Sequence, residues 1–379
     1  MMKKRILFLT GTRADFGKMK SLIACVRDSD VFEYGIFVTG MHMMSRYGLT
    51  ANEIEKSGFS NTFMYMNQSE GDNMDTILAN TIIGLGRYLD EYHYDLIIVH
   101  GDRVEALAGA TTGALRNIRV AHIEGGEVSG TIDELLRHAV TKMSHIHFVA
   151  SDTAKKRLIQ LGEPPENIFM IGSPDIDVML SDQLPTLAEA QKRYEIDFDS
   201  YAIAMLHPVT TEQDRQAENA HIFVDSLIES GRNYLVIYPN NDLGSQAIFE
   251  AYKVLQSNPR FRIFPSIRFE HFLTLLKHAD FLIGNSSAGI HEAPVYAVPT
   301  VNIGMRQHNR ITHDSVHNTE FDKDCILATI GKCLSSKPVP PLYHYGKGGS
   351  AQKFLDALLG NTLTTPTQKH FKDVPFNHD

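Results

Sequence analysis

Residues 280–294, DFLIGNSSAGIHEAP, have the types and spacing that an anion-binding loop needs. An apolar strand is expected to end near Gly284, and the turn after it exposes backbone N–H groups and the hydroxyls of Ser286 and Ser287 at the start of a helix. A phosphate there replaces the acceptors that the first helical turn lacks. Glu292, one turn further on, is placed to accept from a ribose hydroxyl. The alternative is a plain strand-to-helix turn capped by serine.

Three carboxylates accompany consecutive apolar runs in the first half of the chain. Asp102 follows the run 95–101, Glu124 lies in the glycine-rich end of the run 119–126, and Asp133 precedes an expected helix. Because the carboxyl ends of parallel strands share one edge of a sheet, Asp102 and Glu124 should lie close together. Carboxylates gathered in this way serve proton-transfer chemistry. The alternative for Asp133 is a helix N-cap.

Cationic and aromatic side chains follow other strands. His207 leaves an expected buried strand at the start of a helix, where its imidazole is placed to neutralise a phosphate or protonate a leaving group. Arg13 lies in the loop after the first strand, beside backbone donors that suit an anion. The second half adds candidates for an aromatic or backbone cradle for a base and for cations at a diphosphate. These candidates are Asn241, Arg268, Phe269 and Arg306.

Metal-ligand spacing is incomplete in the sequence. Asp-x-Asp pairs occur at 175–177 and 197–199, and a His-x-His pair occurs at 145–147. Each pair lacks a third ligand nearby, so a structural role is the stronger interpretation of all three. We therefore expect no metal site and no cofactor.

The composition predicts a globular protein with two domains. The 379 residues are 43% hydrophobic, which is enough for large cores. The net charge of −9 and the absence of Lys/Arg runs argue against nucleic acid or an anionic membrane as a partner. No apolar stretch approaches the length of a membrane span. Three cysteines without CxxC spacing, and a first apolar run that resembles a strand rather than a signal peptide, predict a cytoplasmic protein.

Short β-rich runs alternate with amphipathic segments along the chain. This pattern predicts an α/β protein with two doubly wound, Rossmann-like domains facing a cleft. The pattern pauses after Pro174, which places the domains at 1–175 and 176–355, with a final segment 356–379 that returns to the first domain. The clearest helices are expected at 74–92 and 103–116. The expected strands are 5–11, 34–40, 95–101, 119–126, 147–151 and 168–173, then 201–208, 234–240, 260–265, 280–285 and 298–304.

Eight motifs run through the chain in a fixed order. They are GTRADFGK (11–18), VTGMHMM (38–44), HGDRVEALAGA (100–110), HIEGGEVSGTIDE (122–134), GSPDIDVM (172–179), HPVTTE (207–212), YPNNDLG (238–244) and GNSSAGIHEAP (284–294). Together they resemble the bacterial hydrolysing UDP-N-acetylglucosamine 2-epimerases. The resemblance implies a glycosyltransferase-B-like fold, metal-free chemistry, and UDP-N-acetylglucosamine and UDP as ligands. It also implies N-acetylmannosamine production as the first step of sialic acid biosynthesis for capsule polysaccharide, and a homodimer or homotetramer.

The resemblance also assigns roles by motif. Asp102, Glu124 and Asp133 match the catalytic carboxylates of the family, and their division of labour stays open. His207 matches the histidine near the leaving diphosphate. The remaining matches are contacts with UDP, which the family binds mainly through its second domain. These are Ser286, Ser287 and Glu292 for the diphosphate and ribose, Arg306 near the nucleotide, and the first-loop Arg13.

Four alternatives to a hydrolysing UDP-N-acetylglucosamine 2-epimerase are compatible with the sequence. The non-hydrolysing epimerases read Gly-Thr-Arg-Pro-Glu in the first loop and His-Arg-Arg-Glu at the position of HPVTTE, and both departures favour hydrolysis here. A second alternative is a hydrolysing epimerase for a UDP-diacetamido-trideoxyhexose. A third is a retaining glycosyltransferase of the same fold, which needs an acceptor. The last is a sensor that binds a nucleotide sugar without turnover, for which the carboxylates would have no purpose.

Overall fold

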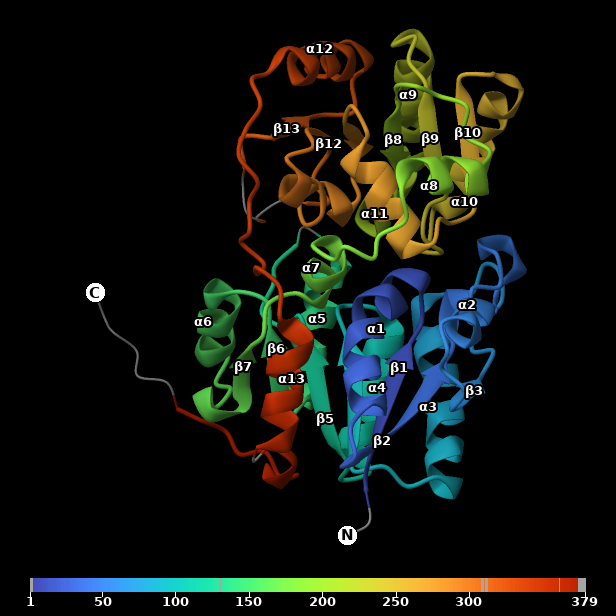
Figure 1. Ribbon diagram of the computed structural model, residues 1–379. Coiled ribbons are helices and arrows are strands. Elements are labelled where there is room, and N and C mark those ends of the chain that lie inside the picture. Colours follow the sequence, from blue (N-terminus) through green and yellow to red (C-terminus); the bar gives the residue numbers. More distant parts are fainter. Residues whose placement is uncertain (1–2, 130, 308–309, 311–312, 361, 374–379) are drawn as a thin grey trace. The chain divides into compact units, whose positions relative to one another are not determined.

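The computed structural model describes residues 3–129, 131–307, 310, 313–360 and 362–373 (Figure 1). Gly130 of the motif 122–134 lies outside this part of the chain. Contacts group the chain into two compact units. The sequence-based domain limits at 175 and 355 stay a prediction. Unit 1 consists of Met1–Glu127, Asp133–Leu180 and His344–Asp379, and unit 2 of Val128–Ile132 and Ser181–Tyr343.

Unit 1 is built on a seven-stranded sheet in the order β3-β2-β1-β4-β5-β6-β7, and every neighbouring pair is parallel. The strand order reverses between β1 and β4, where Phe8 is paired with Ile98. In sheets of this kind ligands bind beyond the carboxyl ends of the strands at such a reversal. The strands are β1 (Lys4–Thr10), β2 (Phe32–Val38), β3 (Thr62–Met64), β4 (Leu96–His100), β5 (Arg119–Ile123), β6 (Ile146–Val149) and β7 (Ile168–Met170).

Two hydrophobic clusters cover the two faces of this sheet. Ile6 and Phe8 of β1 join α1 and α13 in one cluster, whereas Leu7 and Leu9 join α3, α4 and α5 in the other. This alternation along a strand that is buried on both faces makes a three-layer unit. The helices are α1 (Arg13–Arg27), α2 (Ala51–Lys56), α3 (Met74–Glu91), α4 (Val104–Leu115), α5 (Ile132–Met143), α6 (Asp152–Gln160), α7 (Pro174–Met179) and α13 (Ser350–Leu359), with short 3₁₀ turns η1 (Gly40–Met43), η2 (Ser45–Tyr47), η3 (Pro165–Asn167) and η8 (Thr362–Thr364).

The segment after α13 is fastened to the C-terminal end of α5. The Lys369 ammonium donates to the carbonyl oxygens of Ser144 at 2.6 Å and Lys142 at 3.0 Å. It also lies 2.7 Å from the buried Glu163 carboxylate. A cation at the last carbonyls of a helix complements the helix dipole. This contact therefore helps to fix α5, which carries Arg137 toward the site described below.

Unit 2 is a six-stranded parallel sheet in the order β10-β9-β8-β11-β12-β13. Its order reverses between β8 and β11. Gly284 ends β11 with φ +134°, and a Cβ there would lie 1.9 Å from the Met205 carbonyl oxygen, so only glycine fits. The strands are β8 (Ala202–Met205), β9 (Tyr234–Ile237), β10 (Phe261–Phe264), β11 (Leu282–Gly284), β12 (Thr300–Ile303) and β13 (Val316–Thr319).

Helices α9, α10 and α12 pack on the cluster that includes Ala202, Ala204 and Val236. The longer helices of unit 2 are α8 (Leu187–Tyr194), α9 (Gln216–Glu229), α10 (Ser245–Tyr252), α11 (Phe269–Lys277) and α12 (Lys323–Ser335), and the 3₁₀ segments are η4 (Thr210–Arg215), η5 (Lys253–Ser257), η6 (Ser287–Gly289) and η7 (Ala293–Tyr296). The predicted α/β class with two doubly wound sheets is confirmed. Within the described residues, no helix has the length and apolarity required to cross a membrane.

Candidate active site

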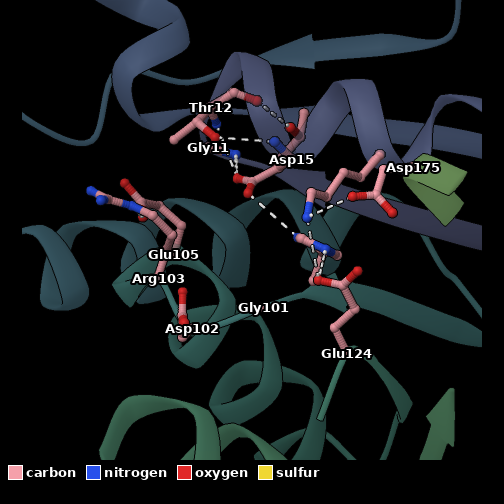
Figure 2. Close-up of polar contacts among 12 residues, drawn as sticks. Gly11, Thr12, Asp15, Gly101, Asp102, Arg103, Glu105, Glu124 and Asp175 are labelled. Carbon is pink, nitrogen blue, oxygen red and sulfur yellow. Dashed lines mark hydrogen bonds and ion pairs between the residues drawn. The ribbon is translucent and has the colours of Figure 1, made fainter. Parts of the chain in front are cut away.

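The carboxyl edge of the unit 1 sheet gathers charged side chains around Glu124 (Figure 2). Glu124 directly follows β5, has an unusual φ of +61°, and is only 5% exposed. Its Oε1 accepts from the Ser173 hydroxyl, and its Oε2 lies 3.1 Å from His100 Nε2 and 3.7 Å from Lys18 Nζ. A left-handed backbone at a buried, multiply bonded carboxylate is the kind of strain that accompanies functional sites.

His100 links this carboxylate to the first loop. The residue ends β4, and its Nδ1 lies 3.5 Å from Asp15 Oδ1 on α1. Burial opposes the imidazolium, but the Glu124 and Asp15 carboxylates outweigh burial and raise the pKa of His100 to about 9. Burial acts to raise the pKa of Asp15, but the nearby His100 imidazole outweighs burial and the pKa of this carboxyl is lowered. His100 is therefore a buried cation between two carboxylates at the reversal of strand order.

Asp102 is joined to Glu124 through a buried arginine. Arg137, 5% exposed and on α5, donates through Nη2 to Asp102 Oδ2 and through Nη1 to the Glu124 backbone oxygen at 2.6 Å. Asp133 is the second residue of α5 rather than its N-cap, and its charge also acts on Arg137. One guanidinium thus orients the loops after β4 and β5, which supports the sequence-based expectation that the two carboxylates lie together.

The first loop is built around a capping box. The Thr12 side chain accepts from Asp15 N, and Asp15 Oδ2 accepts from the backbone N–H groups of Gly11 and Thr12. The buried Glu105 packs against this loop, since a Cβ on Gly11 would lie 3.1 Å from Glu105 Cδ. Arg13 is the first residue of α1, and its Nη2 atom lies 3.8 Å from Glu53 Oε1.

The structure gives both carboxylates of the pair at 175–177 structural partners. Asp175 Oδ2 lies 3.2 Å from Lys18 Nζ. Asp177 accepts from the backbone N–H groups of Ser350 and Ala351, each at 2.9 Å, at the start of α13. The described residues contain no group of three His, Cys, Asp or Glu side chains that could hold a metal ion.

The reversal of strand order in unit 2 brings His207 and the Gly/Ser loop together. His207 lies just after β8, and Asn285 just after β11. Asn285 Oδ1 accepts from His207 N at 2.7 Å, and Asn285 Nδ2 donates to His207 O at 2.8 Å. Arg306 Nη1 donates to Asn285 O at 3.2 Å. Ser286 and Ser287 follow directly in the chain, so these predicted ligand residues form one cluster.

The helix predicted after Gly284 is wrong. The chain forms only the 3₁₀ segments η6 and η7, and Glu292 lies at the N-cap position of η7. Pro294 lacks the N–H that a continuing helix would need, and Gly289 packs closely on Thr300, where a Cβ would meet Cγ2 at 2.5 Å. The loop therefore offers serine hydroxyls and local N–H groups but not the dipole of a full helix, and Glu292 is 5% exposed.

The other predicted nucleotide contacts lie at neighbouring strand ends of unit 2. Arg268 immediately precedes α11, where its backbone N donates to Tyr194 Oη at 2.8 Å and its Nε lies 3.1 Å from Glu270 Oε2. Phe269 is the buried first residue of α11. Asn241 lies in the loop after β9, next to Asn240.

Six residues that the structure brings into these clusters were not among the predicted site residues. They are Asp15, Lys18, His100, Arg137, Ser173 and Asn285. Lys18 lies about one helical turn after Asp15, which places both on one face of α1, and His100 is the last residue of an apolar run. These positions in the sequence could have indicated Lys18 and His100 as site residues. No such signal marks Ser173, because its partner Glu124 is distant in the sequence.

Comparisons with known proteins show which family this chain resembles. The family model described as UDP-N-acetylglucosamine 2-epimerase matches residues 24–359. A Neisseria meningitidis relative named UDP-N-acetylglucosamine 2-epimerase is 48% identical over 98% of this chain and 99% of its own length. A Legionella pneumophila relative named UDP-N,N'-diacetylbacillosamine 2-epimerase (hydrolyzing) is 32% identical over 93% of this chain and 94% of its own length. An Escherichia coli relative named polysialic acid biosynthesis protein P7 is 33% identical over 86% of this chain and 85% of its own length.

The fold has solved counterparts as well. A crystal structure of a UDP-GlcNAc 2-epimerase from Neisseria meningitidis bound to UDP-GlcNAc matches with a TM-score of 0.79 at 17% identity. The match covers 94% of this chain and 100% of that chain. At this identity the likeness bears on the fold alone, which is the glycosyltransferase-B-like arrangement expected from the sequence.

Proposed function

Because this chain belongs to the UDP-N-acetylglucosamine 2-epimerase family, we propose that it is a hydrolysing enzyme that converts UDP-N-acetylglucosamine and water to N-acetylmannosamine and UDP. The observation that carries the proposal is Glu124, a buried carboxylate held by Ser173, His100 and Lys18 at the reversal of strand order in unit 1. Oriented carboxylates are what proton removal and water addition need. Such a cluster has no purpose in a nucleotide-sugar sensor without turnover.

The first step is an elimination. The hydrogen on carbon 2 of the sugar is not acidic, because no carbonyl group is adjacent to it. As the bond between the anomeric carbon and the diphosphate oxygen stretches, positive charge develops on the ring and this hydrogen becomes labile. A carboxylate of unit 1 takes the proton, which leaves 2-acetamidoglucal and UDP. The candidates are Asp102, Glu124 and Asp133.

The second step is hydration of the glucal. Water adds to the anomeric carbon while carbon 2 receives a proton from the opposite face, which gives the manno configuration. This step needs one carboxylate as a base for water and one carboxylic acid as a proton donor. We propose that Glu124 and Asp133 are needed mainly for hydration. Asp102, paired with Arg137, is then the candidate base for the carbon 2 proton in the elimination, and its charge stabilises the cationic transition states on either side of the glucal.

Unit 2 supplies the contacts with UDP in this proposal. Ser286, Ser287 and Arg306 bind the diphosphate, Glu292 accepts from the ribose, and His207 donates to the leaving group. These roles rest on the cluster around Asn285, which joins His207 to the Gly/Ser loop. Arg13, Asn241, Arg268 and Phe269 are further proposed contacts with the substrate.

Two observations favour hydrolysis over return of UDP to the glucal. The segments GTRAD at 11–15 and HPVTTE at 207–212 depart from the pattern of the non-hydrolysing enzymes. The Legionella relative is also named as hydrolyzing. The same relative acts on UDP-N,N'-diacetylbacillosamine by its name, so a diacetamido sugar is the second candidate substrate. The relative named for polysialic acid biosynthesis supports a place at the start of sialic acid synthesis for this chain.

The test is one incubation with UDP-N-acetylglucosamine, followed by proton NMR of the products in chelator-treated buffer. We expect N-acetylmannosamine and UDP in equal amounts. In deuterium oxide, carbon 2 of the product should carry one deuterium, and in oxygen-18 water the released UDP should stay unlabelled, since its bridging oxygen leaves with it. UDP-N-acetylmannosamine as the product would indicate the non-hydrolysing reaction. Turnover only of the diacetamido sugar would change the substrate.

Single replacements in the loop after β11 should weaken UDP binding. Ser287→Ala and Glu292→Ala each remove a proposed partner of a polar ligand group, so each should cost about 1–3 kcal/mol of binding free energy. Isothermal titration with UDP measures the loss. Ser226→Ala is the matched control, because this hydroxyl on α9 bonds only within its helix, to the Ile222 oxygen at 2.7 Å, among its described contacts. Unchanged affinity in both loop variants would move the nucleotide elsewhere.

A further inference from the structure

The His207 imidazole is held in one tautomer by a neighbouring loop of unit 2. The backbone N–H of Asn240 donates to His207 Nδ1 across 3.0 Å. A backbone N–H is always a donor, so Nδ1 is the acceptor in this contact and carries no proton. The proton of the neutral ring is then on Nε2. This one hydrogen bond therefore decides which ring nitrogen of His207 is the donor.

Asn285 fixes the backbone that carries this ring. Its side-chain amide bonds both polar groups of His207, accepting from the N–H at 2.7 Å and donating to the carbonyl at 2.8 Å. Asn285 is 1% exposed, and its own carbonyl accepts from Gln307 Nε2 at 2.8 Å. Because both ends of this buried amide are used, the backbone of His207 cannot shift without the loss of two hydrogen bonds, and the contact with Asn240 N then holds the ring.

We propose that His207 is a neutral hydrogen-bond donor to the leaving diphosphate through Nε2–H, and that Asn285 is its positioning residue. This inference rests on the proposed function above. An imidazolium would place a proton on Nδ1 directly opposite the Asn240 N–H, and that partly buried hydrogen bond would be lost. The result differs from the proton donor or cation that the sequence suggested for His207.

The chemistry of the leaving group fits a donor that keeps its proton. The bond between the anomeric carbon and oxygen breaks with its electron pair on the β-phosphate oxygen of UDP, and the carbon 2 proton goes to a carboxylate. The second pKa of a phosphate monoester is about 6, so the released group is stable as an anion at neutral pH. Charge-assisted hydrogen bonds to that oxygen are therefore sufficient.

Nitrogen-15 NMR of histidine-labelled protein tests the tautomer directly, with His207→Gln used to assign the signals. In the UDP complex at neutral pH we expect a pyridine-type Nδ1 and a pyrrole-type Nε2 for His207. Two protonated ring nitrogens in that complex would overturn the proposal. This measurement needs UDP binding but no turnover, so it separates the tautomer from the assigned reaction.

Two matched pairs of variants test the role. Glutamine places its amide nitrogen near the position of Nε2 and asparagine places it near Nδ1, so His207→Gln should keep a kcat at least about tenfold above His207→Asn. Asn285→Ala should lower kcat more than it raises KM. Asn302→Ala is its control, since Asn302 is equally buried on β12 but bonds Asn318 at 2.8 Å. Equal kcat in both His207 variants, or equal loss in Asn285→Ala and Asn302→Ala, would contradict the assignment.

Discussion

Replacement of Glu124 by glutamine should slow N-acetylmannosamine formation by about 10²–10⁴-fold, the usual contribution of a general acid or base. It should also release 2-acetamidoglucal into solution. The reason is that Glu124 is proposed to act mainly in the hydration step. Elimination would therefore continue, while hydration of the glucal would be slowed. Proton NMR of the reaction mixture detects the glucal, and the ratio of glucal to N-acetylmannosamine measures the imbalance between the two steps.

The environment of Glu124 makes this replacement a sharp test. Glutamine keeps the size of the side chain, but one of its ends becomes an NH₂ donor. Both oxygens of Glu124 face donors, the Ser173 hydroxyl at Oε1 and the His100 Nε2 at Oε2. The Ser173 hydroxyl can accept from an amide NH₂ as well as donate, so glutamine can keep both contacts when its oxygen faces His100. The loss of rate therefore reports mainly the missing negative charge, and the appearance of glucal reports which step is slowed.

Two neighbouring carboxylates provide the comparison. Asp102→Asn should stop both steps without release of glucal, because its charge, paired with Arg137, is proposed to stabilise both transition states. Glu127→Gln is the matched control. Glu127 is as buried as Glu124 and lies in the same loop, but it accepts from the Ser151 hydroxyl at 3.2 Å. Glucal release by Glu127→Gln, or none by Glu124→Gln, would contradict the assigned role of Glu124.

Much of the fold could be predicted because the strands are buried on both faces. The run 95–101 contains the continuous apolar stretch 96–99 and matches β4 within one residue, and the more mixed run 119–126 matches β5 within three residues. Strands β3 and β13 were not predicted, and both are short edge strands of mixed polarity. Edge strands have a smaller apolar requirement, so their sequences carry a weaker signal.

The candidate site was predictable only where chemistry follows a strand directly. Asp102, Glu124 and His207 fulfil that condition. The partners that set their charge and orientation come from other elements, such as Ser173 before α7 and Arg137 within α5. A single sequence does not pair such positions, because tertiary packing brings them together. The helix predicted after Gly284 failed for a local reason, since Pro294 and the close packing of Gly289 outweigh the glycine-serine pattern.

Raising the pH from about 7 through about 9 should destabilise the folded protein, because His100 must lose its proton. The Glu124 and Asp15 carboxylates, working against burial, raise the pKa of His100 from 6.5 to about 9. A group whose folded pKa is raised stabilises the fold fully below its unfolded pKa and loses that contribution as the pH rises through the folded value. For His100 the contribution is on the order of 3 kcal/mol.

Urea unfolding of the wild type and of His100→Gln at several pH values measures the contribution of His100 to the free energy of unfolding. The variant should be less stable near pH 7, since Glu124 and Asp15 lose a cationic partner, and the gap should narrow toward pH 9. Burial also raises the pKa of the Cys25 and Cys333 thiols to about 12, which adds a loss of stability near and above pH 9. That loss is common to both proteins and cancels in the comparison.

Histidine NMR supplies the site-specific check on the same samples. His100 should stay doubly protonated up to about pH 8 and titrate near 9. Burial lowers the pKa of His122 to about 3 and that of His42 to about 4, so both should remain neutral across this range and serve as internal controls. A stability gap that does not change with pH, together with a neutral His100 at pH 7, would mean that His100 contacts Glu124 as a neutral hydrogen-bond donor, with Lys18 as the cation beside this carboxylate.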